Sequence, residues 1–521
     1  MHSKPLLLLL FALLCNQIQA RNASSMASDL RSCLSSAQVH NLSFSSSSSS
    51  FSNLLNISIQ NLRFTDPSIP KPLAIILPST KSQIQTSILC CRRTGVSIRI
   101  RSGGHSYEGQ SSTSSSIPFA IIDLMNLKSI HFDISSNTSW VQAGATIGEL
   151  YLTISNLSNL SLAISAGSCS TMGAGGHIAG GGFGFLSRKY GLAADSVVDA
   201  LLIDYEGKVF DKRSMGTDVF WAIRGGGGGS WGVVYAWKLR AVPVPNTVTR
   251  FTLQRGRATV RDAALLLHKW QTIAPNLPDE FYLSTLISGD INGTLTTISI
   301  SFSGLFLGSK GAAIDILTSR FPELQLNDLD CIEETWLDSA AHYAGLDSSA
   351  HLSNRSQSKD YFKAKSDYVR APISKYDLEK VLDKLAGVSP AYLILDPYGG
   401  AMSRISESDL PFPHRAGILF SIQYLISWTA EDEMSGIGEK YIQDLRGFYE
   451  FMAPFVSKNP REAYVNYLDL DLGLNVGSVE DDRVWGERYF LRNFDRLVKA
   501  KTLIDPHNVF SNQQSIPPLS F

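Results

Sequence analysis

The sequence predicts an α+β protein with two domains, and three features of the chain support this prediction. At 521 residues and 44% hydrophobic content, the chain is long enough to bury several cores. Residues 73–104 alternate an apolar strand, an amphipathic helix and a second strand, which is the pattern of an α/β unit. Residues 296–306, 391–400 and 419–428 have a second group of strand patterns, with a helical stretch at 376–386 among them.

The first domain is expected over residues 21–245 and the second over 246–455. Strand and helix patterns continue through "PFAIIDL" and "VVDALLIDYEGKVF" until Pro243 and Pro245 close the first module. Residues 456–521 then combine an acidic loop with one amphipathic helix, whose apolar positions include Tyr489, Phe490, Phe494, Leu497 and Val498. Because one helix cannot form a core alone, we expect this segment to return to the first domain.

Residues 1–20 have the layout of a secretory signal peptide. A short cationic start at His2 and Lys4 precedes an apolar run from Leu6 to Cys15, and Ala20 suits the cleavage position. The apolar run is too short to span a bilayer comfortably, and no later stretch reaches the length that a span requires. We therefore predict a protein without a membrane span that is secreted to the apoplast or cell wall, or delivered to the vacuole.

Glycosylation sequons agree with passage through the secretory pathway. Eight asparagines stand two residues before Ser or Thr, and we expect N-linked glycans among them. The formal net charge is −1, so no cationic field is present to bind a polyanion, and nucleic acid is not an expected partner. The sequon asparagines are Asn22, Asn41, Asn56, Asn137, Asn156, Asn159, Asn292 and Asn354.

Five cysteines remain once the signal peptide is removed, so at least one thiol has no disulfide partner within the chain. An oxidising compartment favours a bridge from Cys33 to Cys90 or Cys91, and we take Cys90 as the partner. Cys169 lies inside a glycine-rich run, which is an unusual place for a residue that only packs.

Three glycine clusters suggest close approach of the backbone to a ligand: Gly103–Gly104, Gly173–Gly184 and Gly225–Gly229. Gly227, Gly229 and Gly232 match the spacing G-x-G-x-x-G. The text that follows them, "VVYAWKLR", is typical of a strand rather than of the helix that a Rossmann site requires. The clusters therefore indicate a ligand site of a different architecture, and no metal site is predicted.

Several motifs together resemble the plant berberine bridge enzyme-like flavoproteins, within the superfamily similar to vanillyl-alcohol oxidase. They are "RSGGHSYEG", "GSCSTMGAGGHIAGGGFGFLSRKYGLAADSVVDALLIDYEGKV", "DVFWAIRGGGGGSWGVV", "ISESDLPFPHRAG", "AYVNYLDLDLG" and "NQQSIPPL". They occur in order along nearly the whole mature chain. The resemblance implies a PCMH-type FAD-binding domain of two α/β subdomains, followed by a substrate domain whose antiparallel sheet is covered by helices.

The resemblance also implies FAD attached by two covalent bonds. His105 would bond the flavin 8α-methyl carbon and Cys169 would bond the flavin C6 position. The neighbouring glycines would let the backbone pass close to the ring. The cofactor-binding residues implied besides these two are Arg101, Ser102, Gly103, Gly104, Ser106, Gly173, Gly175, Gly176, His177, Gly180, Gly181 and Gly182.

On the substrate side, the resemblance implies Tyr467 as the group that removes a proton, helped by Gln423, with Tyr107 and Tyr190 lining the pocket. A tyrosine base at neutral pH needs a nearby cation, because its ordinary pKa is about 10. The lysine that many relatives place two residues before Gln423 is Ser421 here, which would weaken the base.

Three further positions depart from the family pattern. Met172 occupies the position thought to gate oxygen access to the reduced flavin. Its bulk favours slow reaction with oxygen, although its side chain is flexible. Leu468 replaces an arginine. Leu307 stands where the cannabinoid-forming branch has a histidine, so that activity is not expected.

Three functions follow as hypotheses. The first is an FAD-linked oxidoreductase that takes hydride from a plant alcohol, sugar or phenolic metabolite. The second is a cyclase of the same fold that catalyses a Diels–Alder type cycloaddition of prenylated phenolics without net redox change. The third is a non-catalytic secreted glycoprotein.

Overall fold

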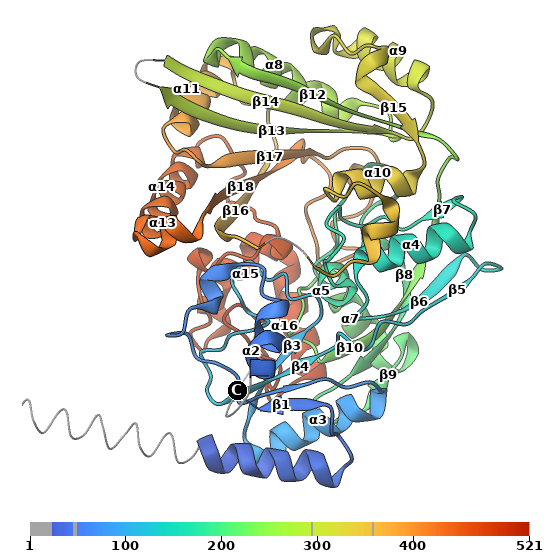
Figure 1. Ribbon diagram of the computed structural model, residues 1–521, viewed down its shortest axis with the longest axis vertical. Coiled ribbons are helices and arrows are strands. Elements are labelled where there is room, and N and C mark those ends of the chain that lie inside the picture. Colours follow the sequence, from blue (N-terminus) through green and yellow to red (C-terminus); the bar gives the residue numbers. More distant parts are fainter. Residues whose placement is uncertain (1–22, 45–48, 293–294, 357–358, 520–521) are drawn as a thin grey trace, which may run out of the picture.

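The computed structural model describes residues 23–44, 49–292, 295–356 and 359–519. The predicted signal peptide and the sequon at Asn22 lie outside these ranges. Figure 1 shows two halves, with a large sheet and its covering helices in one and smaller sheets with both ends of the described chain in the other. This arrangement confirms the α+β class.

The first small sheet has four strands in the order β1 (Leu42–Phe44), β2 (Ala74–Ile76), β4 (Phe119–Asp123), β3 (Ser97–Arg101). β2 and β3 run parallel to β4, and α3 (Lys81–Thr94) connects them, as the strand–helix–strand pattern predicted. The helix buries Ile84 and Ile88 and ends at Gly95 with φ of +71°. The predicted disulfide between Cys33 and Cys90 is present and ties α3 to the N-terminal segment. Between β1 and β2 the chain forms α2 (Ser49–Ile57).

The second small sheet is antiparallel. Its order is β5 (Ile130–Asp133), β6 (Thr138–Gln142), β10 (Val233–Arg240), β8 (Val197–Ile203), β9 (Val209–Phe210). β10 follows directly on the G-x-G-x-x-G spacing, which confirms that no Rossmann helix begins there. The helices and the strand pair of this region are α4 (Ile147–Leu157), α5 (Ala174–Ala179), α6 (Ser187–Tyr190), α7 (Lys212–Ala222), and β7 (Leu162–Ala163) with β11 (Val242–Pro243).

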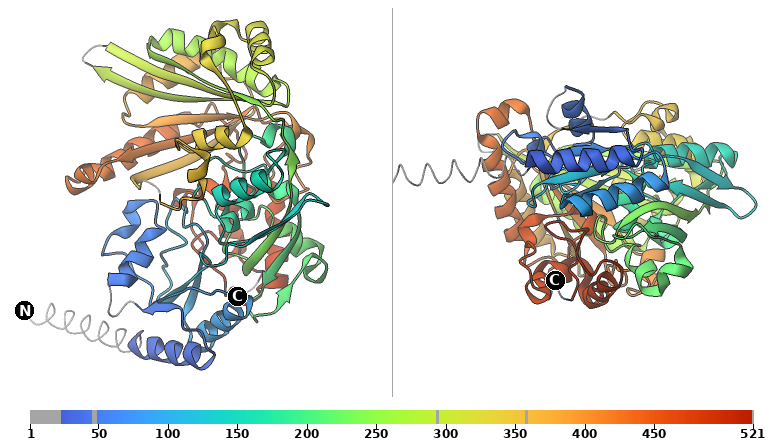
Figure 2. Two further views of the ribbon diagram at one scale, coloured as in Figure 1. Left: turned by 45° about the vertical axis from the view of Figure 1, so that its right-hand side comes forward. Right: turned by 90° about the horizontal axis from the view of Figure 1, so that it is seen from below.

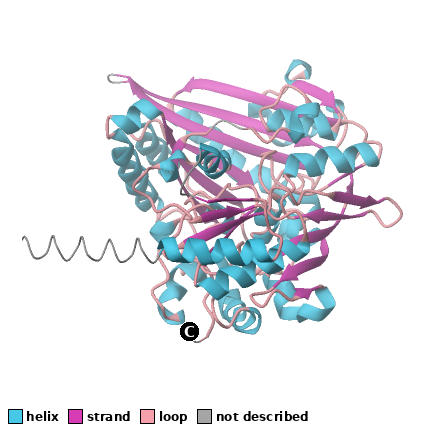
Figure 3. Ribbon diagram, turned by 60° about the horizontal axis from the view of Figure 1, so that its bottom comes forward, coloured by secondary structure: helices cyan, strands magenta, loops and turns pink. Residues whose placement is uncertain are grey.

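A seven-stranded antiparallel sheet forms the core of the second half (Figure 3). Its order is β15 (Cys331–Glu334), β12 (Val248–Ala258), β14 (Leu295–Phe306), β13 (Phe281–Asn292), β17 (Tyr392–Pro397), β18 (Phe420–Trp428), β16 (Tyr361–Val369). One face carries α8 (Val260–Ile273), α11 (Lys375–Ala386) and α14 (Ile437–Met452), whose apolar sides share one core with the sheet. Smaller helices of this half are α9 (Lys310–Arg320), α10 (Trp336–Tyr343), α12 (Ala401–Arg404) and α13 (Ala430–Met434).

The C-terminal segment contains two helices where the sequence predicted one. α15 (Val479–Phe490) ends at Leu491, which adopts φ of +46°, and α16 (Phe494–Ile504) begins three residues later. The break lets Phe494 fold back onto Gly486, where an added Cβ would lie 2.2 Å from the Phe494 ring. α16 packs against α7, which lies in the residue range predicted for the first domain (Figure 2).

The strands of the large sheet all fall between residues 248 and 428, while the domain boundaries at 245 and 455 stay predictions. Within the described ranges, no helix combines the length and apolar character needed to cross a membrane. In the same part of the chain, no three His, Cys, Asp or Glu side chains are grouped so that they could hold a metal ion.

Candidate functional site

A cavity of about 550 Å³ lies where the two small sheets, the large sheet and the C-terminal segment meet. This volume falls within the usual range for small-molecule and cofactor sites. All three glycine clusters contribute to the wall. The predicted residues that line the cavity are Ser102, Gly103, Gly104, His105, Ser106, Tyr107, Cys169, Met172, Gly173, Gly175, Gly176, His177, Gln423 and Tyr467.

The first two glycine clusters lie directly against each other. An added Cβ at Gly103 would stand 2.2 Å from the backbone nitrogen of Gly173, and one at Gly173 would stand 2.1 Å from the Ser102 hydroxyl. Real Cβ atoms do not approach other atoms this closely, so both positions require glycine. This contact places the loop after β3 beside the loop before α5.

The close contact brings His105 and Cys169 to one place. His105 Nε2 lies 2.9 Å from the Thr171 hydroxyl, and the Cys169 sulfur lies 3.6 Å from the same oxygen. Burial lowers the pKa of His105 to about 4, so its imidazole is neutral at neutral pH and its ring nitrogen keeps a lone pair. A neutral imidazole and a thiol that is in no disulfide therefore face the same cavity.

His177 is a second neutral imidazole in the cavity wall. Its Nε2 accepts a hydrogen bond of 2.9 Å from the Gly167 N–H, which leaves the ring proton on Nδ1. Burial lowers its pKa to about 4, and His105 nearby contributes to the shift. Asn466 in the C-terminal segment donates to the His177 carbonyl at 3.0 Å, so this segment helps to fix α5.

Five predicted site residues do not line the cavity, and each has another role. Arg101 is fully buried, where its Nε donates to Asp123 at 2.6 Å, and it is not among the residues that line the cavity. Tyr190 donates its hydroxyl to the Pro243 carbonyl at 2.5 Å, away from the pocket in which the family resemblance placed it. Gly180, Gly181 and Gly182 lie behind the wall, where an added Cβ at Gly180 would meet Asn466 at 2.0 Å.

Tyr107, Gln423 and Tyr467 lie together in the cavity wall, with Tyr107 on the same loop as His105. Gln423 donates from Nε2 to the Tyr107 hydroxyl at 2.8 Å. The rings of Tyr107 and Tyr467 stack with centroids 5.5 Å apart and planes 2° from parallel. The fold thus joins a loop of the first domain, strand β18 and the C-terminal segment at one point.

Both tyrosines are held in the protonated state. Burial raises the pKa of Tyr107, and burial with the neighbouring Tyr107 and Asp396 raises the pKa of Tyr467 well above its usual value. Ser421, which replaces the family lysine, lies opposite Asp396 in the pairing of β17 with β18. At neutral pH both phenols are therefore hydrogen-bond donors in these surroundings, and proton abstraction by Tyr467 stays a prediction.

Asp396 is a further titratable group behind this wall. It lies two residues beyond Ile394, which pairs with Gln423, so its side chain is on the same face of the sheet as Gln423. Tyr282 donates its hydroxyl to the carboxylate, and burial raises the pKa of Asp396 to about 6.

Several wall residues had no predicted role. Phe183 stacks on Tyr398 with centroids 4.9 Å apart, and Tyr464 accepts hydrogen bonds from the backbone N–H groups of Gly182 and Phe183 at 3.1 Å. Tyr392 comes from β17, whose position beside β18 depends on strand order that the sequence does not display. The sequence showed Gly227–Gly229 as a glycine cluster but assigned no role to its individual residues, which line the cavity.

The three departures from the family pattern have different positions. Met172 and Leu468 line the cavity, whereas Leu307 is buried in the core beside it and does not face the cavity. The terminal carbon of Met172 lies 2.7 Å from the place of a Cβ on Gly167, so this side chain fills the space that the glycine leaves.

Comparisons with known proteins agree with this site. Two family models match: "FAD binding domain" over residues 72–212 and "Berberine and berberine like" over residues 463–517. Berberine bridge enzyme-like D-1 from Nicotiana tabacum is 51% identical, over 94% of this chain and 91% of that protein. Reticuline oxidase from Papaver somniferum is 46% identical, over 94% and 92%. The structure of berberine bridge enzyme from Eschscholzia californica has a TM-score of 0.90 at 44% identity, over 95% of this chain and 100% of that chain.

Proposed function

The chain belongs to the berberine bridge enzyme-like family of FAD-dependent oxidoreductases, and from this premise we propose that it carries FAD bonded to His105 and Cys169 and oxidises a small secondary metabolite by hydride transfer. The observation that carries the proposal is the convergence of both side chains on Thr171 within one cavity. Because the chain belongs to a family of enzymes, we no longer consider the hypothesis of a non-catalytic glycoprotein.

The residues present suit FAD. A neutral imidazole and a thiol are the two nucleophiles that covalent attachment requires, and both face the cavity. Gly173, Gly175 and Gly176 of one cluster and Gly227–Gly229 of another leave backbone exposed along the wall, where a flat ring and phosphate oxygens would contact it. Bound FAD would supply the hydride acceptor, and the protein would supply position and hydrogen bonds.

The state of the tyrosines bears on the substrate. Oxidation of an alcohol or sugar to a carbonyl requires a group that takes the hydroxyl proton, and Gln423 has no basic atom for it. With the pKa of Tyr107 and of Tyr467 raised, neither phenol is a base at neutral pH. A substrate whose reacting C–H lies next to an amine nitrogen needs no such base, because the nitrogen lone pair stabilises the cation that hydride loss leaves.

Anaerobic mixing with a panel of alcohols, sugars, phenols and tertiary amines tests the proposal. We expect one class to bleach the flavin absorbance, and we expect an amine to do so at a rate that follows its unprotonated fraction and shows no further rise above the amine pKa. An alcohol that reduced the flavin rapidly at neutral pH would restore Tyr467 as a base. If no class bleached the flavin, the proposed oxidation would be refuted.

Cyclisation without net redox change is the second candidate. Two features favour it. Ser421 in place of lysine would weaken a tyrosine base needed for oxidation, and the bulky Met172 in the cavity would slow reoxidation of the flavin by oxygen. Incubation with a prenylated phenol would then give a cyclised product while the flavin absorbance stays unchanged. Slow reaction of the reduced flavin with oxygen is expected for the oxidoreductase as well, because of Met172.

We also propose that the protein is secreted, or stored in the vacuole, and carries N-linked glycans. The Cys33–Cys90 disulfide is typical of an oxidising compartment. Every sequon asparagine in the described ranges is exposed, as glycan attachment requires. A mass shift on enzymatic removal of N-glycans from the plant-expressed protein tests this proposal.

A further inference from the structure

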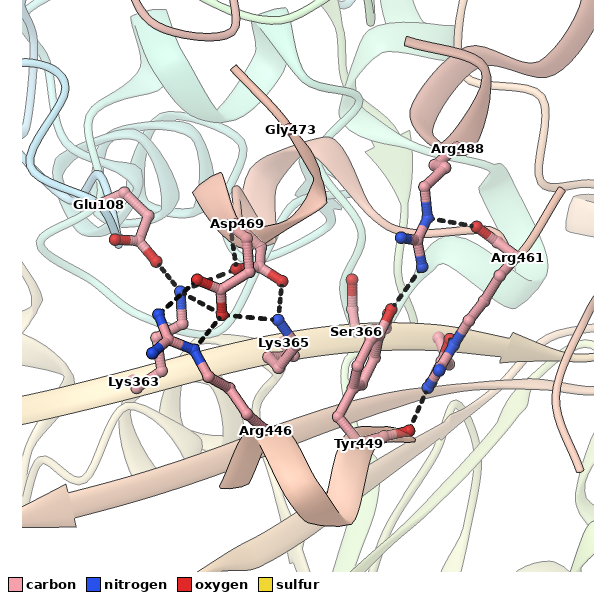
Figure 4. A network of polar contacts seen from close by, with 12 residues as sticks. Glu108, Lys363, Lys365, Ser366, Arg446, Tyr449, Arg461, Asp469, Gly473 and Arg488 are labelled. Carbon is pink, nitrogen blue, oxygen red and sulfur yellow. Dashed lines mark hydrogen bonds and ion pairs between the residues drawn. The ribbon is translucent and has the colours of Figure 1, made fainter. Parts of the chain in front are cut away.

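A cluster of buried ionic side chains includes Glu108, Lys363 and Asp469 (Figure 4). It adjoins the part of the cavity wall formed by Tyr107, Phe362, Gln423 and Tyr467, which we call the substrate wall. Lys363 contacts Glu108, Asp469 at 2.8 Å and Asp471 at 3.3 Å. Lys365 contacts Asp469 at 2.5 Å and Asp471 at 2.9 Å. The side chains of Lys363, Lys365 and Asp469 are 2–3% exposed.

The charges in this ionic cluster balance. Arg446 of α14 adds a third cation, which binds Asp471 with contacts of 2.6 and 3.0 Å. Three cations therefore face the three carboxylates of Glu108, Asp469 and Asp471. Because burying charges costs free energy even when they are paired, such a cluster is weak evidence for stability, and a role in fixing the relative placement of segments is the better explanation to test.

Apart from Arg446, the members of the cluster come from the loop after β3, strand β16 and the C-terminal segment, and each of these also contributes a side chain to the cavity wall. Glu108 directly follows Tyr107, and Lys363 directly follows Phe362, whose ring meets Tyr107 edge-on at 5.3 Å. Asp469 stands two residues after Tyr467. Each aromatic side chain thus faces the cavity, while the charged neighbour in its segment joins the cluster.

Strand geometry explains this division on β16, the edge strand of the large sheet. Phe362 pairs with Ser427 on β18, which lines the cavity, so Phe362 is on the cavity face. Lys363 and Lys365 alternate with it and point to the opposite face, where α14 and the C-terminal segment cover them. Asn61 adds a second connection, because its amide donates to the carbonyls of Tyr107 at 2.9 Å and Phe362 at 2.8 Å.

We propose that Lys363 is a positioning residue for the substrate wall: its ammonium joins Glu108 to Asp469 and thereby fixes the spacing of Tyr107 and Tyr467. Lys365 differs in one respect, since it binds the carboxylates of the C-terminal segment but not Glu108. Of the two lysines, Lys363 is the one that bridges the loop of the first domain and the C-terminal segment, which also meet where Gln110 and Gln513 exchange hydrogen bonds of 2.8 and 3.2 Å. This inference rests on the proposed function, because it takes the two tyrosines as contacts of the substrate.

Hydrogen exchange of the holoenzyme tests the bridge without any substrate. The Gly109 N–H donates to the Ser106 carbonyl and the Tyr467 N–H donates to the Tyr464 carbonyl, so both amides report on the segments concerned. In Lys363→Met both should exchange at least about tenfold faster, while strand β4 keeps its rates. In Lys365→Met, the matched control, only the Tyr467 amide should change. Equal acceleration throughout the protein, or no change at Gly109, would overturn the proposal.

Binding of p-cresol, followed by the change in flavin absorbance, gives the second readout. Lys363→Met should weaken it on the order of tenfold, since misplaced contacts of about 1 Å cost up to 100-fold in productive positioning. Lys363→Arg should recover most of the loss. A double variant Glu108→Gln with Lys363→Met should be no worse than Lys363→Met alone, whereas additive losses would contradict action through Glu108.

Failure of Lys363→Met to fold and failure of p-cresol to bind the parent enzyme have different consequences. If Lys363→Met does not fold, Glu108→Gln replaces it, and it should loosen the Gly109 amide but not the Tyr467 amide; loosening of neither would refute the bridge. If p-cresol does not bind the parent enzyme, the proposed substrate wall is wrong, while the exchange pattern still decides whether Lys363 ties the two segments together.

Discussion

Replacing Gly176 by alanine tests whether FAD lies against helix α5. Gly176 lines the cavity from the interior of this helix, and an added Cβ would meet no protein atom within 4 Å. The protein itself therefore has room for the methyl group. Any harm that the substitution does must come from something that fills the cavity.

The structure gives the sign and size of both effects. Alanine inside a helix is more favourable than glycine by roughly 1 kcal/mol, so the free energy of unfolding without cofactor should rise slightly. An extra methyl group pressed against a bound ring costs about 1–3 kcal/mol, as overpacking does in a protein core. Since about 1.4 kcal/mol is a factor of ten in affinity, FAD should bind roughly 5- to 150-fold more weakly before it becomes attached.

The assay compares the flavin-to-protein ratio after acid precipitation with the free energy of unfolding of the flavin-free fraction. Gly176→Ala should lower the ratio and leave the stability equal or higher. Gly103→Ala is the contrasting variant, because its Cβ would clash with the Gly173 nitrogen at 2.2 Å, and it should lose stability and flavin together. A Gly176→Ala protein with full covalent flavin and an unchanged spectrum would show that FAD does not pass along α5.

Three further predictions follow. His105→Ala and Cys169→Ala should each keep an FAD adduct in the intact mass, since the other bond remains, and the double variant should lose it; an adduct on the double variant would refute the assignment of both anchors. Arg101→Met should lower the free energy of unfolding by about 3–5 kcal/mol in denaturant titration, because Asp123 is left buried and unpaired, without changing the flavin spectrum of the folded fraction. Asp396 has its folded pKa raised to about 6, so the folded state holds this proton more tightly than the unfolded chain, and stability falls as pH rises from about 4 to 6. Asp396→Asn should therefore gain about 3 kcal/mol over the parent between about pH 4 and pH 7 in urea titrations, and equal slopes for the two proteins would contradict the raised pKa.

Local sequence patterns predicted the elements well where they carried their own signals. α3 has buried positions three and four residues apart and a glycine at its end, and β14 and β18 have alternating apolar runs, so their bounds were close to those expected. The tail was predicted as one helix because its apolar spacing continues across Leu491. The break there depends on Phe494 packing onto Gly486, which is a contact between residues whose meeting no periodicity shows.

The candidate site divides in the same way. His105, Cys169 and the glycines around them were recognisable because each lies in a short frame whose residue types are unusual side by side. Tyr190 and Arg101 have equally suggestive neighbours, yet the structure turns one towards Pro243 and the other towards Asp123. Phe183 and Tyr392 were missed because no local sequence pattern distinguishes an aromatic residue that lines a cavity from one that packs in a core.

The sequence alone determined which groups are available: an imidazole and a thiol in glycine-rich loops, a tyrosine with a glutamine as its expected helper, and a serine in place of a lysine. These depend on residue identity and on neighbours a few positions away. The tertiary structure decided which groups meet, because the contacts of Glu108 with Lys363 and of Tyr107 with Tyr467 join residues hundreds of positions apart. Burial, which sets the charge state of the histidines and phenols, arises only when those segments come together.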